Sequence, residues 1–144
     1  MIIRSYRPTD YDQIVTLYKR SELYGGVFDE ERDTAERLRK RVEADPGAII
    51  VAEEDETIIG TVSLIEDGRV AWLYRFCVLP TPENLQLDEA VAQSLCETAV
   101  NSLQQKGHKQ VLVYTSQDHS LQTRYTDLGF TKGSDYSCFF KDIT

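Results

Sequence analysis

The sequence predicts an α/β fold of the α+β type, with a mixed, mostly antiparallel central sheet and helices on both faces. Three observations support this prediction. Runs of β-branched and aromatic residues alternate with longer segments whose apolar residues recur at helical spacing. Three such runs, residues 48–53, 57–65 and 70–79, follow one another across tight turns, as in an antiparallel meander. A long helical segment then leads to a further apolar run at 110–115, which is typical of parallel pairing through a crossover.

Length and composition fit one globular domain, residues 1–144. No apolar run approaches the roughly 18 residues needed to span a bilayer, and the first residues lack the pattern of a signal peptide. We therefore expect a cytoplasmic protein that does not bind membranes. The formal net charge of −8 argues against nucleic-acid binding, which needs Lys and Arg to neutralise phosphates. An acidic surface favours a cationic partner, such as an amine.

Cysteine and histidine give no sign of disulfide or metal chemistry. Cys77, Cys96 and Cys138 are widely spaced among apolar or strand-like neighbours, so we expect small core side chains. His108 and His119 lie apart without the spacing of metal ligands, and we expect both at the surface. No metal site is predicted.

The first third of the chain predicts a strand and two helices. Residues 2–6 form the strand, and Thr9 or Asp10 can cap the helix that follows. The apolar stripe of that helix consists of Ile14, Leu17 and Tyr18. Gly25-Gly26 ends this segment. A second, highly charged helix is expected over residues 29–44.

The middle of the chain predicts three strands. Residues 48–53 and 57–65 flank an acidic turn and should form a hairpin. Asp67-Gly68 makes a second tight turn before the strand at 70–79. Pro80 ends this third strand.

The last part of the chain predicts a crossover helix and shorter elements. Thr81 should cap the helix, with Pro82 at its first position. A strand at 110–115, a short helix at 119–127 and a final strand at 137–141 complete the order. In such a mixed sheet, ligands bind where parallel pairing meets antiparallel pairing, at the carboxyl ends of the strands. We therefore expect a crevice beyond residue 79.

Four segments of the chain, in order, carry a resemblance to a known family: Ile3-Arg4-x-Tyr6-Arg7-Pro8-x-Asp10, residues 51–60, residues 73–80 and Tyr125-Thr126-Asp127-Leu128-Gly129-Phe130. Together they resemble the GNAT superfamily of acyl-CoA-dependent N-acyltransferases. The resemblance implies a GNAT-like sheet with a V-shaped splay between its two central strands. It also implies acetyl-CoA as a co-substrate.

The resemblance implies roles for residues beside that splay. Phe76, Cys77 and Val78 occupy the strand that pairs with the pantetheine arm in the family, next to a β-bulge. Backbone N–H groups near Val78 would polarise the thioester carbonyl. Tyr125 matches the tyrosine that protonates the leaving thiolate, for which a neutral phenol is suited. The alternative for Tyr125 is a core tyrosine that packs against the sheet.

The phosphate-binding loop of the family, Gln/Arg-x-x-Gly-x-Gly/Ala, has no clear counterpart. No glycine lies between Pro80 and Gly107. Counting forward from Pro80 places Glu83, Gln86 and Asp88 at the key positions. Counting back from Gly107 places Leu87, Ala90 and Ala92 there, with Val91 between them. The forward alignment puts carboxylates against phosphates, and the backward alignment offers no charge.

Other departures concern charge at the cofactor site. Asp118 falls where the family often has Asn, and a carboxylate cannot donate the hydrogen bond that an amide can. Arg124 and Lys132 are candidate cations that could compensate for the missing loop, and each is also explained as ordinary surface. We therefore expect acetyl-CoA to bind because the chain resembles the family, and not because residues 80–92 show the phosphate-binding pattern.

The acceptor side of the site is predicted from aromatic residues. Tyr24 and Tyr74 are the candidates for substrate binding, with Glu66 as a further one. Strand alternation places Tyr74, Phe76 and Val78 on one face. Trp72 is expected in the core or as a cover.

Two functions of different class follow from this pattern. The first is an N-acyltransferase that moves an acetyl or acyl group from acyl-CoA to a primary amine, of a small molecule or a protein, by direct attack. The second is a catalytically silent GNAT-like module that binds a protein partner or a small ligand in the former cofactor cleft. A homodimer through sheet edges is a further possibility that the family suggests.

Overall fold

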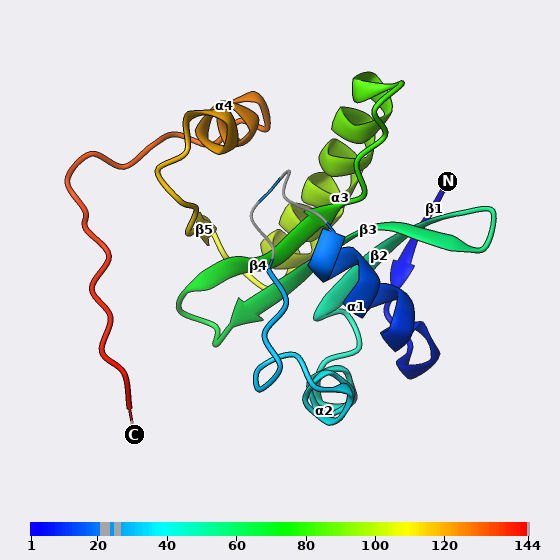
Figure 1. Cartoon of the computed structure of the whole chain (residues 1–144). Coiled ribbons are helices and arrows are strands. Elements are labelled where there is room, and N and C mark those ends of the chain that lie inside the picture. The colour runs from blue at the N-terminus through cyan, green and yellow to red at the C-terminus, as the bar shows by residue number, and fades with distance from the viewer. Residues whose placement is uncertain (21–23, 25–26, 144) are drawn as a thin grey trace.

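The computed structural model describes residues 1–20, 24 and 27–143. Its sheet has five strands in the order β1-β2-β3-β4-β5 (Figure 1). The strands are β1 (Ile2–Ser5), β2 (Ile49–Glu54), β3 (Thr57–Glu66), β4 (Ala71–Val78) and β5 (Leu112–Val113). The first three pairings are antiparallel and the pairing of β4 with β5 is parallel. The mixed, mostly antiparallel sheet is thereby confirmed.

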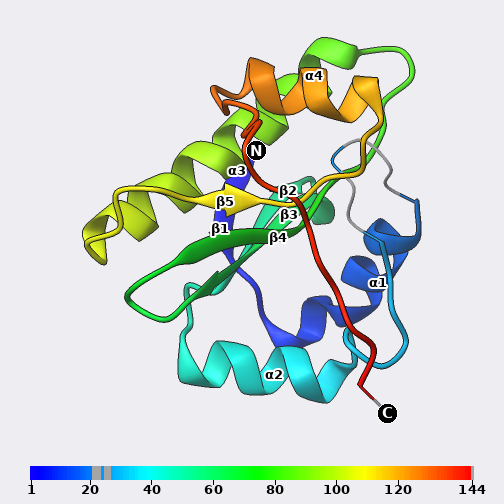
Figure 2. The ribbon, with the colours of Figure 1, turned by 90° about the vertical axis from the view of Figure 1, so that its left-hand side faces the viewer.

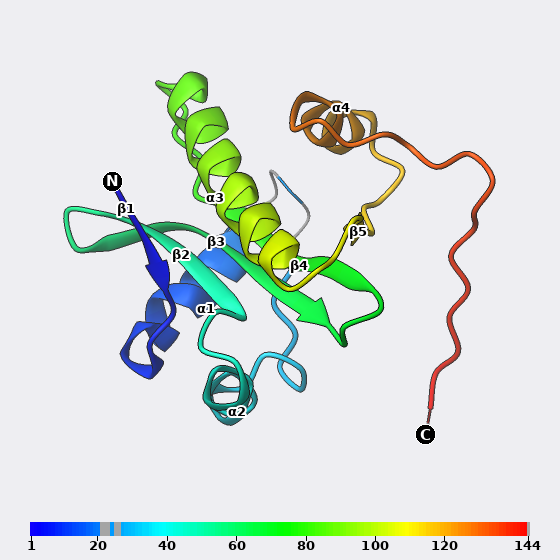
Figure 3. The same cartoon turned by 180° about the vertical axis from the view of Figure 1, so that it is seen from behind.

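Helices cover both faces of the sheet (Figures 1, 2 and 3). They are α1 (Tyr11–Arg20), preceded by the single 3-10 turn η1 (Pro8–Asp10), α2 (Ala35–Ala44), α3 (Leu85–Gln105) and α4 (His119–Asp127). In Figure 3 the long α3 crosses the near face of the sheet, α1 lies behind the strands and α2 lies below them. None of the helices in the described part of the chain is both long and apolar enough to cross a membrane.

Each face of the sheet has its own apolar core. On one face, α3 packs on β2, β3 and β4 through Val91, Leu95 and Ala99. On the other face, Ile14 and Leu17 of α1 share an apolar core with residues of β2, β3 and β4. Gly60 of β3 lets α3 approach closely, because a Cβ there would lie 2.8 Å from Leu95 Cδ1 and 2.9 Å from Val91 Cγ1.

Asp10 organises the start of the first helical segment, and the alternative cap Thr9 is not needed. Its carboxylate accepts hydrogen bonds from the Arg7 N–H at 2.8 Å and from both terminal nitrogens of Arg4 at 2.8 and 3.0 Å. Burial acts to raise the pKa of Asp10, but these hydrogen bonds outweigh it and the pKa is lowered. The predicted break at Gly25-Gly26 lies outside the described residues.

The second helix begins later than predicted. It starts at Ala35, because the Thr34 hydroxyl caps it by accepting the N–H of Arg37 at 3.2 Å. Residues 29–33 form turns instead, since the Asp29 and Asp33 carboxylates accept backbone N–H groups locally. The prediction of helix over residues 29–34 is therefore wrong.

Helix α3 also begins later than predicted. Its cap is Asn84, which accepts the N–H of Leu87 at 3.1 Å, and not Thr81. Pro82 lies in a turn before the helix rather than at its first position. The Asn84 side chain can cap a helix as well as a threonine can, and the turn at residues 82–83 places it three residues before the Leu87 N–H.

The predicted final strand is absent. Residues 131–143 form neither helix nor strand and all are exposed, and Figures 1 and 3 show them as an extended trace away from the sheet. Phe139 is 92% exposed and Cys138 is exposed, so Cys138 is not a core residue as expected. Cys77 and Cys96 are buried as predicted. Without this strand, β5 is the edge of the sheet, and the splay lies beside the edge rather than between two central strands.

His108 is not a surface residue, contrary to the prediction. Its side chain is 4% exposed, and its Nε2 lies 2.9 Å from a carboxylate oxygen of Glu66. The tight turn after α3 folds the imidazole back against the end of β3, which the sequence does not show. Among the described residues no group of three or more His, Cys, Asp or Glu side chains could hold a metal ion.

Candidate active site

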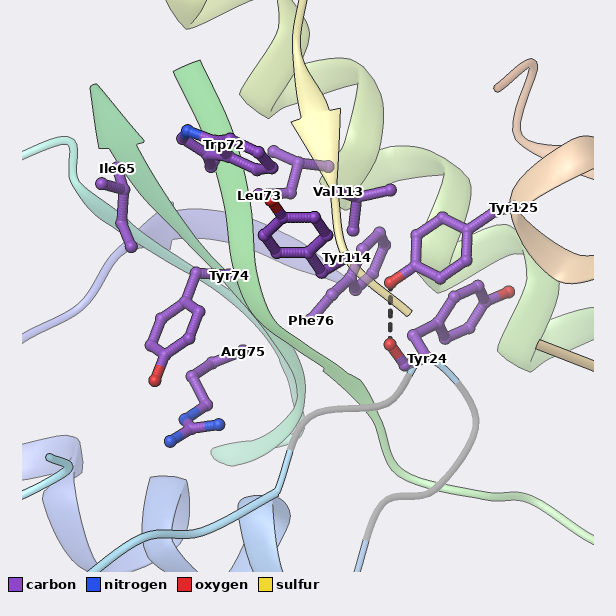
Figure 4. Close-up of a pocket in the computed structure, with 10 residues that line it drawn as sticks. All are labelled: Tyr24, Ile65, Trp72, Leu73, Tyr74, Arg75, Phe76, Val113, Tyr114 and Tyr125. Atoms are coloured by element: carbon purple, nitrogen blue, oxygen red, sulfur yellow. Dashed lines mark hydrogen bonds between the residues drawn. The ribbon is translucent and has the colours of Figure 1, made fainter. Parts of the chain in front are cut away.

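Strands β4 and β5 separate soon after they meet. They pair only at Trp72 with Leu112 and at Leu73 with Val113. A cavity of about 460 Å³ opens where the ladder stops (Figure 4). Its wall is formed by Tyr24, Ile65, Trp72, Leu73, Tyr74, Arg75, Phe76, Val113, Tyr114 and Tyr125. A cavity of this size at a switch in strand direction is a typical ligand site.

A β-bulge in β4 shapes this cavity. Ser63 pairs with Tyr74 and Thr61 pairs with Cys77, so β4 has one residue more than β3 between these pairs. Arg75 carries the irregularity, with a φ of 49° that is uncommon for a residue with a Cβ. An extra residue shifts the alternation of every side chain beyond it.

The bulge corrects the predicted facing of the strand. Leu73, Phe76 and Val78 pack on the α3 side, whereas Cys77 packs on the α1 side. Tyr74 is therefore not on the face of Phe76 and Val78, as simple alternation predicted. Figure 4 shows Tyr74 and Arg75 directed away from Phe76.

A buried ion pair holds the bulge in place. Arg75 Nε donates to Asp33 Oδ1 at 3.0 Å, and Arg75 Nη2 lies 2.9 Å from Asp33 Oδ2. The side chains are 11% and 4% exposed. Burial acts to lower the pKa of Arg75, but the hydrogen bond to Asp33 outweighs it and the pKa is raised. The pair fixes the segment before α2 to β4 (Figure 4 shows Arg75).

Tyr125 lies at the inner wall of the cavity and is almost completely buried. Its hydroxyl donates to the main-chain carbonyl oxygen of Tyr24 at 2.7 Å, the dashed line in Figure 4. Burial raises the pKa of Tyr125 well above its usual range, so the phenol is neutral at physiological pH. A neutral phenol beside a cavity can donate a proton.

The segment Tyr125-x-x-Leu128-Gly129-Phe130 positions this phenol. The N–H of Phe130 donates to the Tyr125 carbonyl at 3.0 Å and the N–H of Gly129 to the Thr126 carbonyl at 3.0 Å, which closes α4. Gly129 has a φ of 94°, the left-handed conformation that such a helix end requires. The ring of Phe130 then packs edge-on against Tyr125, with centroids 5.6 Å apart. The pattern therefore has a structural reason beside any catalytic one.

Tyr24 completes the inner wall. Its ring stacks on Phe76 with centroids 4.7 Å apart and meets Tyr125 edge-on at 5.8 Å. Arg124 lies over the Tyr24 ring, 5.6 Å from the centroid. The structure therefore brings Tyr24, Phe76 and Tyr125, which the sequence placed in separate roles, into one aromatic cluster (Figure 4).

The start of α3 is held by its own acidic residue. Asp88 is 1% exposed. Its two carboxylate oxygens accept the Thr81 N–H at 3.0 and 3.1 Å. The turn at residues 80–84 is thus tied to the first helical turn. A backbone N–H that an open loop would offer to a phosphate is already used by this carboxylate.

The residues of the backward loop alignment lie inside the helix. Leu87 and Ala90 are exposed on α3, whereas Val91 and Ala92 are 1% and 0% exposed and pack against the sheet. All four lie in the helix rather than in an open loop, and their role in cofactor binding stays a prediction.

Asp118 and the two candidate cations have local partners. Asp118 caps α4, where its carboxylate accepts the N–H of Leu121 at 3.1 Å. An acceptor is what a helix cap needs, which explains why an amide donor is not required there. Lys132 Nζ lies 3.4 Å from the side-chain oxygen of Gln122. Of the two cations, only Arg124 contacts the aromatic cluster, through the ring of Tyr24.

The sequence missed the ion pair of Asp33 and Arg75 and the cavity residues Ile65, Val113 and Tyr114. No local signal marks these residues, because Asp33 and Arg75 are 42 positions apart and a positive φ at arginine has no sequence signature. Tyr114 could have been noticed as an aromatic residue at the end of the predicted strand 110–115. Its ring lies 4.6 Å from that of Trp72, which is itself a wall residue and not a buried core residue.

Comparison with known proteins places this chain in a family. The model of the acetyltransferase (GNAT) domain matches residues 12–143. The chain therefore belongs to the GNAT acetyltransferase family. An acetyltransferase of Photorhabdus laumondii is 30% identical over 80 residues, which make up 56% of this chain and 53% of that protein. The match thus spans about half the length of this curated relative.

Solved structures share the fold along nearly the whole chain. The PaiA N-acetyltransferase of Thermoplasma acidophilum, in complex with coenzyme A, has a TM-score of 0.73 at 21% identity and covers 94% of this chain and 92% of its own. The aminoglycoside 6′-N-acetyltransferase of Acinetobacter haemolyticus has a TM-score of 0.71 at 19% identity and covers 100% of both chains. At such identities the likeness is one of fold.

Proposed function

We propose that this protein transfers the acetyl group of acetyl-CoA to a primary amine. The observation that carries the proposal is the cavity where β4 and β5 separate, with the neutral phenol of Tyr125 in its wall. Membership of the GNAT acetyltransferase family supports it, and so does the coenzyme A in the related T. acidophilum structure. The acceptor amine enters the cavity, and the thioester lies along β4.

The proposed reaction is direct transfer. The neutral amine nitrogen attacks the thioester carbonyl carbon, and the tetrahedral intermediate is stabilised by backbone N–H groups of β4 near the bulge. The carbon–sulfur bond then breaks, Tyr125 gives its proton to the departing thiolate, and the amine loses a proton to water. Tyr125 regains its proton from solvent, so no covalent enzyme intermediate forms.

The ion pair of Arg75 and Asp33 supports this chemistry by holding the strand. The bulge places Arg75 in a strained backbone conformation that persists only when its surroundings impose it. The bidentate contact with Asp33 is such a constraint. Phe76, Cys77 and Val78 follow directly, so their backbone direction depends on the bulge.

A second candidate is a catalytically silent module that uses the cavity for a partner or ligand. The observation that favours it is the start of α3, where the Asp88 carboxylate takes the Thr81 N–H and leaves acidic charge at the expected phosphate position. Arg124 and Lys132 are the cations that could offset this charge on the proposed enzyme. The cytoplasmic location, the single domain and the homodimer stay predictions.

Calorimetry with acetyl-CoA and with S-acetylpantetheine distinguishes the two functions. Micromolar binding of acetyl-CoA that weakens when the nucleotide and diphosphate are missing supports the enzyme. No heat at millimolar acetyl-CoA, with no thiol release in the presence of amines, supports the silent module.

A pair of variants sharpens this experiment. Asp88→Asn keeps a hydrogen-bond acceptor for Thr81 but removes a charge, so we expect a lower Kd for acetyl-CoA if the diphosphate lies at this helix start. Asp12→Asn is the matched control, because Asp12 occupies the first turn of α1 and is exposed. An equal effect of both variants would show that only net charge matters.

A further inference from the structure

Aromatic rings form most of the cavity wall. Six of the ten residues that line it are aromatic, namely Tyr24, Trp72, Tyr74, Phe76, Tyr114 and Tyr125. Five of them form two groups, a stacked inner pair of Tyr24 and Phe76 beside Tyr125, and an outer pair of Trp72 and Tyr114. Tyr114 is 68% exposed, so the outer pair is open to solvent. Figure 4 shows both groups around the same opening.

The wall contains one ionised group, and that group is neutralised. Arg75 is the only residue of the described wall that carries a full charge, and Asp33 pairs with it through both carboxylate oxygens. Asp33 Oδ2 also accepts the N–H of Asp29 at 2.8 Å. This carboxylate is therefore committed to its partners and cannot serve as a counter-ion for a ligand.

Two other acids near the cavity, Glu66 and Asp88, have partners of their own. Glu66 follows the wall residue Ile65 on β3 but contacts His108 at 2.9 Å and Lys106 at 3.4 Å. Asp88 holds the Thr81 N–H. Among the described residues no carboxylate lines the cavity.

We propose that the acceptor is an arylalkyl monoamine, a single primary amine on a short chain with an aromatic ring, and not a polyamine or an aminosugar. The ligand ring packs against Trp72 and Tyr114, where offset or edge-on contacts between rings are favourable. The single ammonium group lies over an aromatic face by a cation–π contact. This proposal rests on the proposed function for its chemistry, since it names the acceptor of the same reaction.

The lack of carboxylates among the described lining residues disfavours polycations for a physical reason. Each additional ammonium group that enters the cavity loses its hydration, and no carboxylate offsets that cost. For a single ammonium the same environment has a benefit. The cation–π contact with an aromatic face offsets part of the desolvation cost of this one charge.

The fluorescence of Trp72 tests the proposal directly, because Trp72 is the only tryptophan of the chain and lies in the wall. The protein is titrated with 2-phenylethylamine and with spermidine, in the absence and in the presence of coenzyme A. We expect the Kd of 2-phenylethylamine to be about tenfold lower than the Kd of spermidine, because one good ring contact gives a ratio of this size. Spermidine binding that is equal or tighter in both conditions overturns the proposal, and so does the absence of any response to 2-phenylethylamine.

Two variants test the position of the ring. Tyr114→Ala removes an exposed side chain that contacts Trp72, and we expect it to weaken 2-phenylethylamine binding about fivefold or more. Tyr136→Ala is the matched control, because Tyr136 is 87% exposed and lies in the C-terminal segment outside the cavity. Equal effects of the two variants contradict the proposed ring position.

The outcome also separates this inference from the proposed function. Selective binding of 2-phenylethylamine without acetyl transfer refutes the transferase but leaves an aromatic-amine site. Acetyl transfer to spermidine at a kcat/KM equal to or above that for 2-phenylethylamine refutes the acceptor class but leaves the transferase.

Discussion

Replacing Tyr125 by Phe separates its structural role from a catalytic one. The variant removes only the hydroxyl that donates to the Tyr24 carbonyl at 2.7 Å and keeps the ring contacts with Phe76 and Phe130. The carbonyl of Tyr24 loses this donor inside a buried cluster. Because an unsatisfied buried acceptor costs about 1–3 kcal/mol, we expect the free energy of unfolding to fall by that amount in urea.

The catalytic consequence is of a different size. If Tyr125 protonates the thiolate, its loss should reduce kcat by about a hundredfold or more, while KM for acetyl-CoA changes little. Release of the coenzyme A thiol is followed at a temperature well below the unfolding midpoint, so the loss of stability does not affect the rate. Because burial raises the pKa of Tyr125, the wild-type rate should show no decline from deprotonation of this group up to about pH 10, its unperturbed pKa.

Thr61→Val is the matched control for this prediction. Thr61 is fully buried, and its hydroxyl donates to the Ile50 carbonyl at 2.8 Å, so the variant also removes one buried hydroxyl without changing shape. We expect a similar loss of stability with unchanged kcat. A kcat for Tyr125→Phe within about twofold of wild type, beside the expected loss of stability, would refute the general-acid role and leave Tyr125 as a core residue.

Three further predictions concern the framework of the site. Asp33→Asn leaves the buried guanidinium of Arg75 without its counter-ion, so we expect the free energy of unfolding in urea to fall by about 3 kcal/mol, and an unchanged urea midpoint would contradict the role of the pair. Gly60→Ala brings a Cβ within 2.8 Å of Leu95 Cδ1, and we expect a loss of about 1–3 kcal/mol that Leu95→Val partly restores in the double variant. The lowered pKa of Asp10 gives stability that is present above its unfolded value, about pH 3.9, and is lost as the pH falls through the folded value. Asp10→Asn should therefore flatten the acid limb of a plot of unfolding free energy against pH, and an unaltered limb would assign the acid sensitivity to other carboxylates.

Local patterns in the sequence predicted most of the elements. The meander of β2, β3 and β4 and the bounds of α4 agree with the prediction, because alternation, turn residues and helix ends act over a few neighbouring residues. The same local signals failed where two caps competed. Thr81 and Asn84 are both good caps, and the buried contact of Asp88 with Thr81 decides between them.

The candidate site was predicted only in part. Tyr24, Tyr74, Phe76 and Tyr125 line the cavity, but Cys77 and Val78 are buried in the core and the loop at the start of α3 is closed by Asp88. Their proposed roles as cofactor contacts stay untested. The turn at residues 80–84 was not predicted, because this segment has no glycine to mark the turn in the sequence.

The sequence by itself determined the antiparallel meander, the crossover helix and the position of Tyr125 at the end of a short helix, but it wrongly predicted a final strand. The tertiary structure decided what these elements present to a ligand. The bulge at Arg75 reverses the facing of the strand, Asp33 reaches it from 42 positions away, and the Tyr125 hydroxyl meets the Tyr24 carbonyl 101 positions away. Such contacts depend on how the elements pack, and packing brings together residues whose neighbours in the chain carry no record of the partner.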